Sequence, residues 1–290
     1  MTLLQAILLG IVQGLTEFIP ISSTAHLVLA SRVMNLALSP EQLTSSIAVI
    51  QLGTLVAVIA YFIGDIWHIA RAFIHDHFML LKNGRRDQFN RTNANARLSH
   101  EALLGWLVII GSLPVAVVGL AFKKQIEGTF TKNLWVIATM MIVVALLLAI
   151  AEAVGKKQRR MQDLGVGDAL AVGFAQCLAL IPGSSRSGST IMAGLFAGET
   201  RETAARFSFL LSMPAIAASG LLELKEALHL LPQGSLTTLA LGTIVSAVVG
   251  YASIWFLLRY LKTHTTHVFI YYRFALGAIM IALLLTGYLH

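Results

Sequence analysis

Six stretches of this chain are apolar over lengths that match the thickness of a lipid bilayer. A helix needs about 20 consecutive apolar residues to cross the hydrocarbon layer. Hydrophobic residues make up 57% of the chain and charged residues only 12%, whereas about a quarter of the residues of soluble domains are charged. Hydropathy therefore predicts an all-α polytopic membrane protein with transmembrane helices at 41–63, 101–121, 133–154, 204–223, 236–258 and 267–288.

This composition excludes a disordered chain, a soluble enzyme and a disulfide scaffold. The single cysteine, Cys177, lies in an apolar run and is expected to be a buried thiol without a redox role. The net charge of +7 fits basic loops at a membrane surface. We expect no nucleic-acid partner, because no basic soluble domain is long enough to form such a surface.

Two further apolar segments, 1–35 and 166–200, are interrupted midway by Pro, Ser and Gly. The interruptions are Ile19-Pro20-Ile21-Ser22-Ser23-Thr24 and Ile181-Pro182-Gly183-Ser184-Ser185-Arg186-Ser187-Gly188. Irregular backbone at membrane depth is tolerated only where it is buried in protein or lines a cavity. We therefore expect two re-entrant, broken helices that together mark a site.

The two broken segments resemble each other in sequence. Gly10-x-x-Gln13-x-Leu15 is matched by Gly173-x-x-Gln176-x-Leu178, and Ile19-Pro20-x-Ser22-Ser23 by Ile181-Pro182-x-Ser184-Ser185. This pattern indicates an internal repeat within one integral membrane domain, with halves at about 1–154 and 166–290. Chance similarity between apolar segments is the alternative.

The distribution of basic residues predicts the orientation of the chain. If each broken segment enters and leaves at one face, the loops 64–100, 155–168, 199–206 and 259–266 share a side, and they carry most of the 21 Lys and Arg residues. The positive-inside rule makes that side cytoplasmic. The first broken segment then enters from outside and the second from inside, so the repeat is inverted and both termini lie outside.

Three ionisable residues lie in or beside the interruptions: Glu17, His26 and Arg186. Charged groups within a membrane are costly and mark functional sites. In the sequence, hydroxyl residues and glycines lie close to these three ionisable residues, namely Ser22, Ser23, Thr24, Gly183, Ser184, Ser185, Ser187 and Gly188. A guanidinium, the N-termini of broken helices and glycines that permit close approach are the parts of an anion site. These residues predict an intramembrane phosphate-handling site, with a structural polar network as the alternative.

Several chemical roles are open to these residues. Ser23 is the candidate nucleophile, with Glu17 or His26 in reach as base. Alternatively His26 or a metal-bound water attacks and Ser23 is a ligand. Arg186 is expected to hold the phosphate and stabilise the transferred group. Gln51, the polar side chain in the middle of its span, either lines the site or bonds to a neighbouring helix.

Other polar residues have structural interpretations. Hydroxyls in membrane helices often bond to a carbonyl one turn earlier, which we expect of Ser189, Thr190, Ser208 and Ser212. In the polar loop that we expect at 64–100, His75-Asp76-His77 has metal-ligand residue types, but solvated side chains are favoured there. Charged residues near the ends of spans are expected to extend to the membrane interface, namely Glu152, Glu223 and Arg273.

The two interruptions carry a specific resemblance. Gln13-Gly14-Leu15-Thr16-Glu17-Phe18-Ile19-Pro20-Ile21-Ser22-Ser23-Thr24-Ala25-His26 and Pro182-Gly183-Ser184-Ser185-Arg186-Ser187-Gly188 are similar to the two signature motifs of the bacterial undecaprenyl-diphosphatase family, also called bacitracin-resistance proteins. The resemblance extends to Ile50-Gln51-Leu52-Gly53-Thr54 and Phe207-Ser208-Phe209-Leu210-Leu211, and length and hydropathy agree throughout.

The resemblance implies an enzyme of the bacterial cytoplasmic membrane that converts undecaprenyl diphosphate to the monophosphate and inorganic phosphate. The lipid carrier of cell-wall precursors is thereby recycled. By position, Glu17, Ser23, His26 and Arg186 match the proposed catalytic residues of the family, with Ser22, Thr24 and Ser185 beside them. A divalent cation, Mg²⁺ or Ca²⁺, and a site open to the outer face are also implied. The lipid diphosphate and the bilayer are the expected partners, and the sequence leaves the oligomeric state open, a homodimer included.

Two positions depart from the family pattern. Gln13 stands where some members have Glu, one turn before Glu17 on the same helix face. An amide oxygen coordinates a cation without contributing charge, so Glu17 must carry more of a metal site made with Gln13. Ala25 stands where Gly is common, which matters only if its φ is positive.

Two other functions compete with this interpretation. Inverted repeats with broken helices are typical of transporters, so a polyprenyl-phosphate lipid transporter is the alternative to the enzyme. Lipid phosphatases of the acid-phosphatase type have His six residues after the Arg of a Ser-Arg motif. Here Ser185-Arg186 is followed at that distance by Met192, so that interpretation fails.

Overall fold

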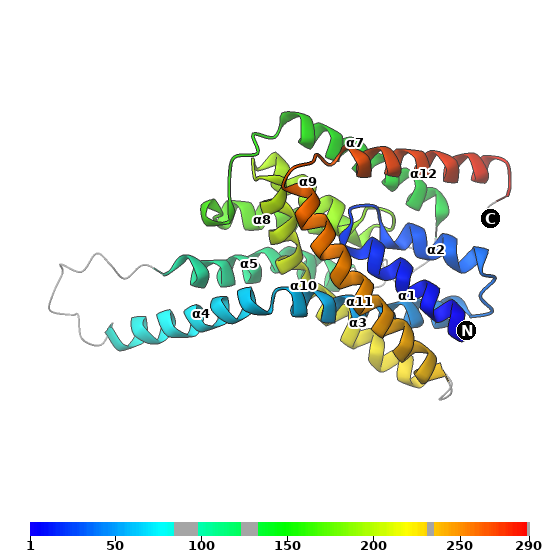
Figure 1. Ribbon diagram of the computed structural model, residues 1–290, viewed down its shortest axis with the longest axis horizontal. Coiled ribbons are helices and arrows are strands. Elements are labelled where there is room, and N and C mark those ends of the chain that lie inside the picture. Colours follow the sequence, from blue (N-terminus) through cyan, green and yellow to red (C-terminus); the bar gives the residue numbers. More distant parts are fainter. Residues whose placement is uncertain (84–97, 123–132, 231–234, 289–290) are drawn as a thin grey trace.

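The computed structural model describes residues 1–83, 98–122, 133–230 and 235–288. The described residues are almost entirely helical (Figure 1). The helices are α1 (Leu3–Phe18), α2 (Ser23–Val33), α3 (Pro40–Tyr61), α4 (Ile63–Asn83), α5 (His100–Ala121), α7 (Leu134–Val154), α8 (Val166–Gln176), α9 (Arg186–Phe196), α10 (Arg201–Leu230), α11 (Ser235–Leu261) and α12 (His267–Leu285), with short 3-10 turns at Met161–Asp163 and Cys177–Leu180. The predicted turn at 123–132 lies outside the described residues.

The six predicted spans are confirmed as helices. By length and apolar composition, α3, α5, α7, α10, α11 and α12 can each cross a membrane. Local sequence sets several of their starts, because Ser39, Ser99 and Asn133 each accept a hydrogen bond from the first turn of the helix that follows. The helix containing the fourth predicted span continues beyond the predicted end at 223, to Leu230.

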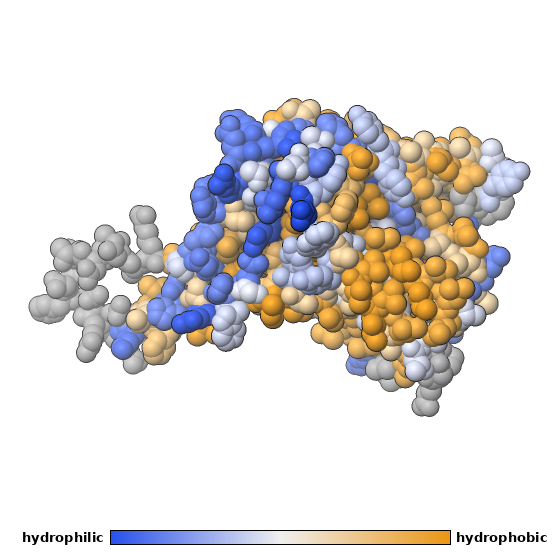
Figure 2. Space-filling model, viewed as in Figure 1, coloured by the Kyte–Doolittle hydropathy of each residue, from blue (hydrophilic) through white to orange (hydrophobic). Residues whose placement is uncertain are grey.

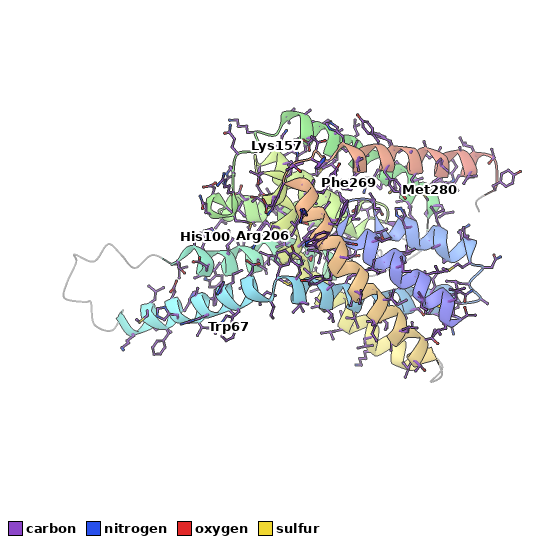
Figure 3. The ribbon with its side chains drawn as sticks, viewed as in Figure 1. Trp67, His100, Lys157, Arg206, Phe269 and Met280 are labelled. Atoms are coloured by element: carbon purple, nitrogen blue, oxygen red, sulfur yellow. The ribbon has the colours of Figure 1, made fainter. Side chains whose placement is uncertain are left out.

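The prediction of a polar loop from 64 to 100 is wrong over its first part, because residues up to Asn83 form α4. One face of this helix packs on α5, where the ring of Phe73 contacts Trp106 and lies beside Gly105. Trp67, 66% exposed, lies on the side of α4 that faces away from the body of the molecule (Figure 3). Apolar residues at helical spacing, interleaved with His and charged residues, therefore form an amphipathic helix here.

Both broken segments are re-entrant. The start of α1 and the end of α2 meet through a hydrogen bond from Gln5 Nε2 to the carbonyl of Met34, 3.2 Å. The residues before α8 and after α9 meet through a hydrogen bond from the backbone N–H of Thr200 to the carbonyl of Arg159, 2.8 Å. Each segment therefore enters and leaves at one face, as expected.

The turn that starts the second helix of each broken segment is built in the same way. Ser22 and Ser185 have φ values of 76° and 68°, a region that residues other than glycine seldom adopt. Each is a helix N-cap whose Oγ accepts a hydrogen bond from an N–H three residues on, at Ala25 and Gly188. Ser22 is therefore equivalent to Ser185, and Ser23 to Arg186, so the sequence match of Ser22 with Ser184 is wrong by one residue.

Glycines bring the first helix of each broken segment against a long span. A Cβ atom on Gly10 of α1 would lie 2.4 Å from the carbonyl oxygen of Gly242 in α11. A Cβ atom on Gly173 of α8 would lie 2.3 Å from the carbonyl oxygen of Gly111 in α5. Small residues permit such backbone contact between membrane helices. The two crossings are equivalent contacts in the two parts of the chain.

Ion pairs gather four connecting segments at one end of the molecule, which we call the polar end. The pairs are Asp65–Arg206, Glu202–Lys262, Glu152–Arg201 and Arg159–Asp168. Figure 3 labels Lys157, His100 and Arg206 in this region, and Figure 2 shows hydrophilic residues concentrated there, beside a broad apolar surface over α1 and α11. The start of α1 and the end of α12 lie at the opposite end (Figure 1).

Candidate active site

The carboxylate of Glu17, at the end of α1, is the centre of a buried polar cluster. Its Oε1 atom accepts a hydrogen bond from Arg186 Nη2 of α9 at 3.2 Å. Its Oε2 atom accepts from Gln13 Nε2 at 3.0 Å and from Ser23 Oγ at 3.2 Å. The structure therefore brings together four of the residues predicted from the sequence, from both broken segments.

The guanidinium of Arg186 has unused hydrogen-bonding capacity. It pairs with Glu17, and Nη1 donates to the carbonyl of Ser208 in α10 at 3.5 Å. Its Nε atom is buried and has no partner among the described residues. Only 10% of the side chain is exposed. A guanidinium presents donors in a planar fork that matches a phosphate group, and Arg186 retains donors for one.

The remaining residues of the second interruption mostly build its turn. Ser185 Oγ lies 3.2 Å from Ser187 Oγ, and Ser187 Oγ donates to the carbonyl of Ile19 in the first interruption at 3.4 Å. Ser184 Oγ donates to the carbonyl of Ile181. Gly183 has φ +90°, and a Cβ there would lie 2.3 Å from the carbonyl oxygen of Ile137 in α7. These contacts hold the two interruptions together.

Arg273 of α12 is completely buried, so the prediction that it extends to the membrane interface is wrong. Its guanidinium donates to the carbonyls of Pro20, Gly183 and Ser184 at 3.4, 3.1 and 3.1 Å. It also donates to the carbonyls of Met140 and Met141 in α7. Arg273 therefore joins both interruptions to α7 and α12, which pack along each other near Phe269 and Met280 (Figure 3).

His26 lies apart from the hydrogen-bonded cluster around Glu17. Its Nδ1 atom is 2.7 Å from the carbonyl oxygen of Ser22, and its Nε2 atom is 2.6 Å from the hydroxyl of Tyr272 in α12. No hydrogen bond joins His26 to Ser23 among the described residues. In this arrangement Glu17, and not His26, is the group in hydrogen-bonding contact with the Ser23 hydroxyl.

The other sequence-predicted residues have simpler surroundings. Thr24 is exposed at the start of α2, and Gln51 is half-buried on α3 without a hydrogen bond to the cluster. Ala25 lies within α2, so its φ is not positive and the departure from Gly costs little. Thr190 and Ser212 bond to carbonyls of the preceding turn, as expected, and Thr190 Oγ1 also lies 2.6 Å from Ser208 Oγ. The expected carbonyl bond is wrong for Ser189, whose Oγ is buried and has no partner in the described part of the chain.

The donor set around Glu17 fits a divalent cation that also binds substrate oxygens. The buried Oε1 atom of Gln13 has no hydrogen-bond partner among the described residues, and the Glu17 carboxylate and the Ser23 hydroxyl are bonded to one another beside it. Mg²⁺ usually takes one or two protein oxygens and completes its shell with water and phosphate. Within the described residues, no group of three or more His, Cys, Asp and Glu could hold a metal by itself.

The alternative metal motif at His75-Asp76-His77 is occupied by structural bonds. His77 Nε2 accepts from Trp106 Nε1 at 3.0 Å, and His77 Nδ1 lies 2.6 Å from the carbonyl oxygen of Phe73. Hydrogen bonds from the Ser99 hydroxyl and N–H lower the pKa of Asp76 to about 2. These residues therefore fasten α4 to α5.

Besides Asp168, the carboxylates of Glu152 and Glu199 are buried near the polar end. Glu152 pairs with Arg201 and accepts from the hydroxyl of Thr266, so the prediction that it extends to the interface is wrong. Glu199 follows α9 and is fully buried, with no partner for either oxygen among the described residues. Burial and the nearby Asp168 carboxylate together raise the pKa of Glu199 to about 7, against the opposing effect of Arg159. The side chain of Glu223 lies outside the described residues.

Sequence reasoning missed two residues at this site, Tyr272 and Arg273. The signal for Arg273 was a cation within an apolar span, the same signal that singled out Arg186. Its position near the start of the span suggested the interface instead. Tyr272 carries no such signal, because tyrosines near the ends of membrane helices are common.

The chain matches a known family over nearly its whole length. The model of the family described as bacitracin resistance protein BacA matches residues 6–279. A protein named undecaprenyl-diphosphatase from Syntrophobacter fumaroxidans is 51% identical over 283 residues, 97% of each chain. Proteins of the same name from Mycolicibacterium gilvum and Chlorobium phaeobacteroides are 45% and 46% identical, over 99% and 100% of this chain and 98% and 99% of their own.

Proposed function

This chain belongs to the bacitracin resistance protein family, and from that premise we propose that it removes the terminal phosphate of undecaprenyl diphosphate at the cluster around Glu17. The products are undecaprenyl phosphate and inorganic phosphate. The reaction returns the lipid carrier to the form used in cell-wall synthesis, and a cell that maintains it tolerates bacitracin. The chain is a multi-pass protein, with the bacterial cytoplasmic membrane as its place of action.

One observation carries this proposal: both interruptions contribute to a single cluster. Glu17 and Ser23 come from the first and Arg186 from the second, and the Glu17 carboxylate contacts both partners at 3.2 Å. Ser23 as the candidate nucleophile, Glu17 as a proton acceptor and the Arg186 guanidinium as a phosphate-binding group thus lie close together. A structural network would also form such bonds, but it would not require unused donors on Arg186.

Arg186 is the residue proposed to bind the diphosphate. In phosphoryl transfer, catalysis rests on positioning and on stabilising charge spread over the transferred oxygens. The N–H groups of Arg186 and Ser187 begin α9 and have no hydrogen-bond partner among the described residues. Free N–H groups at a helix start favour an anion. The guanidinium and the helix start together form the proposed phosphate subsite.

Ser23 is the proposed nucleophile and Glu17 the acceptor of its proton. Ser23 Oγ attacks the terminal phosphorus, the bond from that phosphorus to the bridging oxygen breaks, and undecaprenyl phosphate leaves. The hydroxyl proton passes to Glu17 Oε2, to which it already donates a hydrogen bond. Water then hydrolyses the phosphoserine and releases inorganic phosphate. Direct attack by His26 is less favoured, because its Nε2 atom is held by Tyr272.

A divalent cation, Mg²⁺ or Ca²⁺, is proposed to bind at Glu17 and Gln13. When bound it neutralises charge on the phosphate oxygens and polarises the phosphoryl group. The Glu17 carboxylate supplies the one protein charge of this donor set, and the unpartnered Oε1 of Gln13 supplies a neutral oxygen. The affinity of the free protein for the cation is therefore expected to be low and to rise with the substrate present.

The site is proposed to open to the outer face of the membrane. The polar end carries the basic connecting segments, which the positive-inside rule assigns to the cytoplasm. The first broken segment enters from the opposite end. Glu17, Ser23 and His26 all belong to that segment, so a substrate headgroup on the outer leaflet would reach them first.

Phosphate release by the purified protein tests this function. Detergent-purified protein is incubated with undecaprenyl diphosphate, with and without a chelator, and inorganic phosphate is measured. We expect release that the chelator suppresses. A folded protein that releases no phosphate, but moves labelled undecaprenyl phosphate across the bilayer of a liposome, would be a transporter, and the proposed function would be wrong.

A further inference from the structure

The imidazole of His26 is held on both nitrogens and on one face. Nδ1 lies 2.7 Å from the carbonyl oxygen of Ser22, and Nε2 lies 2.6 Å from the hydroxyl of Tyr272. The two rings are stacked, with centroids 5.5 Å apart and an angle of 9° between their planes. The partners are 246 positions apart in the sequence, so this contact depends on the tertiary fold.

These contacts specify which tautomer a neutral His26 imidazole adopts. A carbonyl oxygen only accepts hydrogen bonds, so Nδ1 must carry the proton that it donates to Ser22. In a neutral ring Nε2 then has a lone pair, and the Tyr272 hydroxyl donates to it. The side chain is thereby kept as a proton acceptor at Nε2.

The fold gives Tyr272 a fixed position. Its neighbour Arg273 donates to carbonyls of Pro20, Gly183 and Ser184, which joins this part of α12 to both interruptions. The phenol itself is 44% exposed, so it retains freedom to turn aside when a ligand enters. A rigid backbone with a partly exposed side chain suits a group that orients another residue.

The second broken segment has no equivalent of this contact. His26 is the fourth residue after the N-cap Ser22, and the fourth residue after the equivalent N-cap Ser185 is Ser189. Ser189 Oγ is buried without a partner among the described residues. The turn can therefore form without an imidazole and a tyrosine, so the pair serves something other than the shape of the turn.

We propose that Tyr272 is a positioning residue for His26, which it holds as the neutral tautomer with its lone pair on Nε2. This inference rests on the proposed function and adds a role for His26, which follows Ser23 by three residues in α2 and keeps a lone pair that can accept a proton. Tyr272 acts through His26 and does not bind the diphosphate, so its hydroxyl affects the turnover number rather than the Michaelis constant.

Carbethoxylation of His26 tests the contact without any need for activity. Diethyl pyrocarbonate reacts with the lone pair of a neutral imidazole, and the product is measured by mass spectrometry of the peptide that contains His26. Tyr272→Phe keeps the stacked ring but uncovers Nε2, so His26 should react about 3 to 10 times faster, the factor that one neutral hydrogen bond provides. The matched control is Tyr271→Phe, since Tyr271 stacks on His267 instead. An unchanged His26 rate in Tyr272→Phe would overturn the proposal.

Steady-state kinetics of phosphate release tests the effect on the reaction. Tyr272→Phe is expected to lower kcat by about 3- to 10-fold with KM within about 2-fold of wild type, and Tyr271→Phe to leave both unchanged. A wild-type kcat in Tyr272→Phe contradicts the positioning role. If the wild-type protein releases no phosphate, the proposed function fails separately, and carbethoxylation still decides whether Tyr272 covers His26.

Discussion

The carboxylate of Glu17 and the guanidinium of Arg186 lie 3.2 Å apart although the residues are 169 positions apart in the sequence. Only 6% of the Glu17 side chain and 10% of the Arg186 side chain are exposed. A buried charge that loses its partner is strongly destabilising, because it stays out of water without compensation. This ion pair therefore holds the two broken segments together, and it brings a residue from each into the candidate active site.

Arg186→Lys should keep the charge but lose most of the activity. An ammonium group lacks the planar fork that contacts two phosphate oxygens at once. We expect kcat/KM for phosphate release to fall by roughly 10²-fold, the usual cost of one lost transition-state donor. The matched control is Arg206→Lys, because Arg206 pairs with Asp65 at the polar end. Near-wild-type activity in Arg186→Lys would exclude a bidentate role.

Ser23→Ala should abolish turnover if Ser23 is the nucleophile. Loss of an attacking group costs roughly 10³-fold or more in kcat. Ser31→Ala on the same helix removes a hydroxyl that only bonds to the carbonyl of Val28, and should be silent. Mass spectrometry of wild-type protein quenched during turnover should detect phosphoserine at position 23. Full turnover by Ser23→Ala would instead favour a metal-bound water.

Arg273→Met should destabilise the fold as well as the site. The substitution leaves the buried carbonyls of Pro20, Gly183 and Ser184 without their donor. We expect a loss of about 3 kcal/mol or more, since a hydrogen bond from a charged group contributes about 1.5–3 kcal/mol. Thermal unfolding in detergent, followed by tryptophan fluorescence, measures it. Arg259→Met, at the end of α11 where the guanidinium lies over Trp255, is the control. Equal melting temperatures for Arg273→Met and wild type would mean that Arg273 does not hold the two interruptions together.

Glu199→Gln should change how stability depends on pH. Burial raises the pKa of Glu199 from 4.5 to about 7, so the folded chain keeps a proton that the unfolded chain releases above pH 4.5. The stability associated with this proton is complete below pH 4.5 and is lost as the pH rises to about 7. The loss amounts to about 3 kcal/mol at pH 8.

Glutamine stays neutral, so the variant should gain stability over wild type at pH 8 and match it near pH 4.5. Melting temperatures in detergent across this range make the comparison. Glu202→Gln, whose carboxylate is partly exposed and paired with Lys262, should follow the wild-type curve. A Glu199→Gln curve parallel to wild type would mean that Glu199 is charged in the folded chain.

Hydropathy was sufficient to predict the spans and the two interruptions, because a bilayer imposes length and apolarity on each crossing segment. It was not sufficient for α4. In α4, apolar residues are interspersed with His and charged residues, and the helix is ordered by tertiary contacts such as those of Phe73 and His77 with Trp106. The polar residues of 64–83 suggested a loop because hydropathy ignores such tertiary contacts.

The candidate site was predicted in part. Glu17, Ser23 and Arg186 were singled out because charged and hydroxyl groups beside a break are costly unless they act together. The surroundings of His26 could not be deduced. Its spacing of three residues from Ser23 suggested contact between the two side chains, whereas the imidazole is turned toward Tyr272 of α12. Contacts from a span more than 240 residues away, such as those of Tyr272, have no local sequence signal.

The most direct test of the central claim is a double-mutant cycle on Glu17 and Arg186. Phosphate release from undecaprenyl diphosphate is measured as kcat/KM for wild type, Glu17→Gln, Arg186→Gln and the double variant, with circular dichroism to verify the fold. We predict that each single variant loses almost all activity and that the double variant loses little more, because residues that act as a unit are not additive. Substantial activity in Glu17→Gln, or losses that multiply in the double variant, would contradict a shared catalytic cluster.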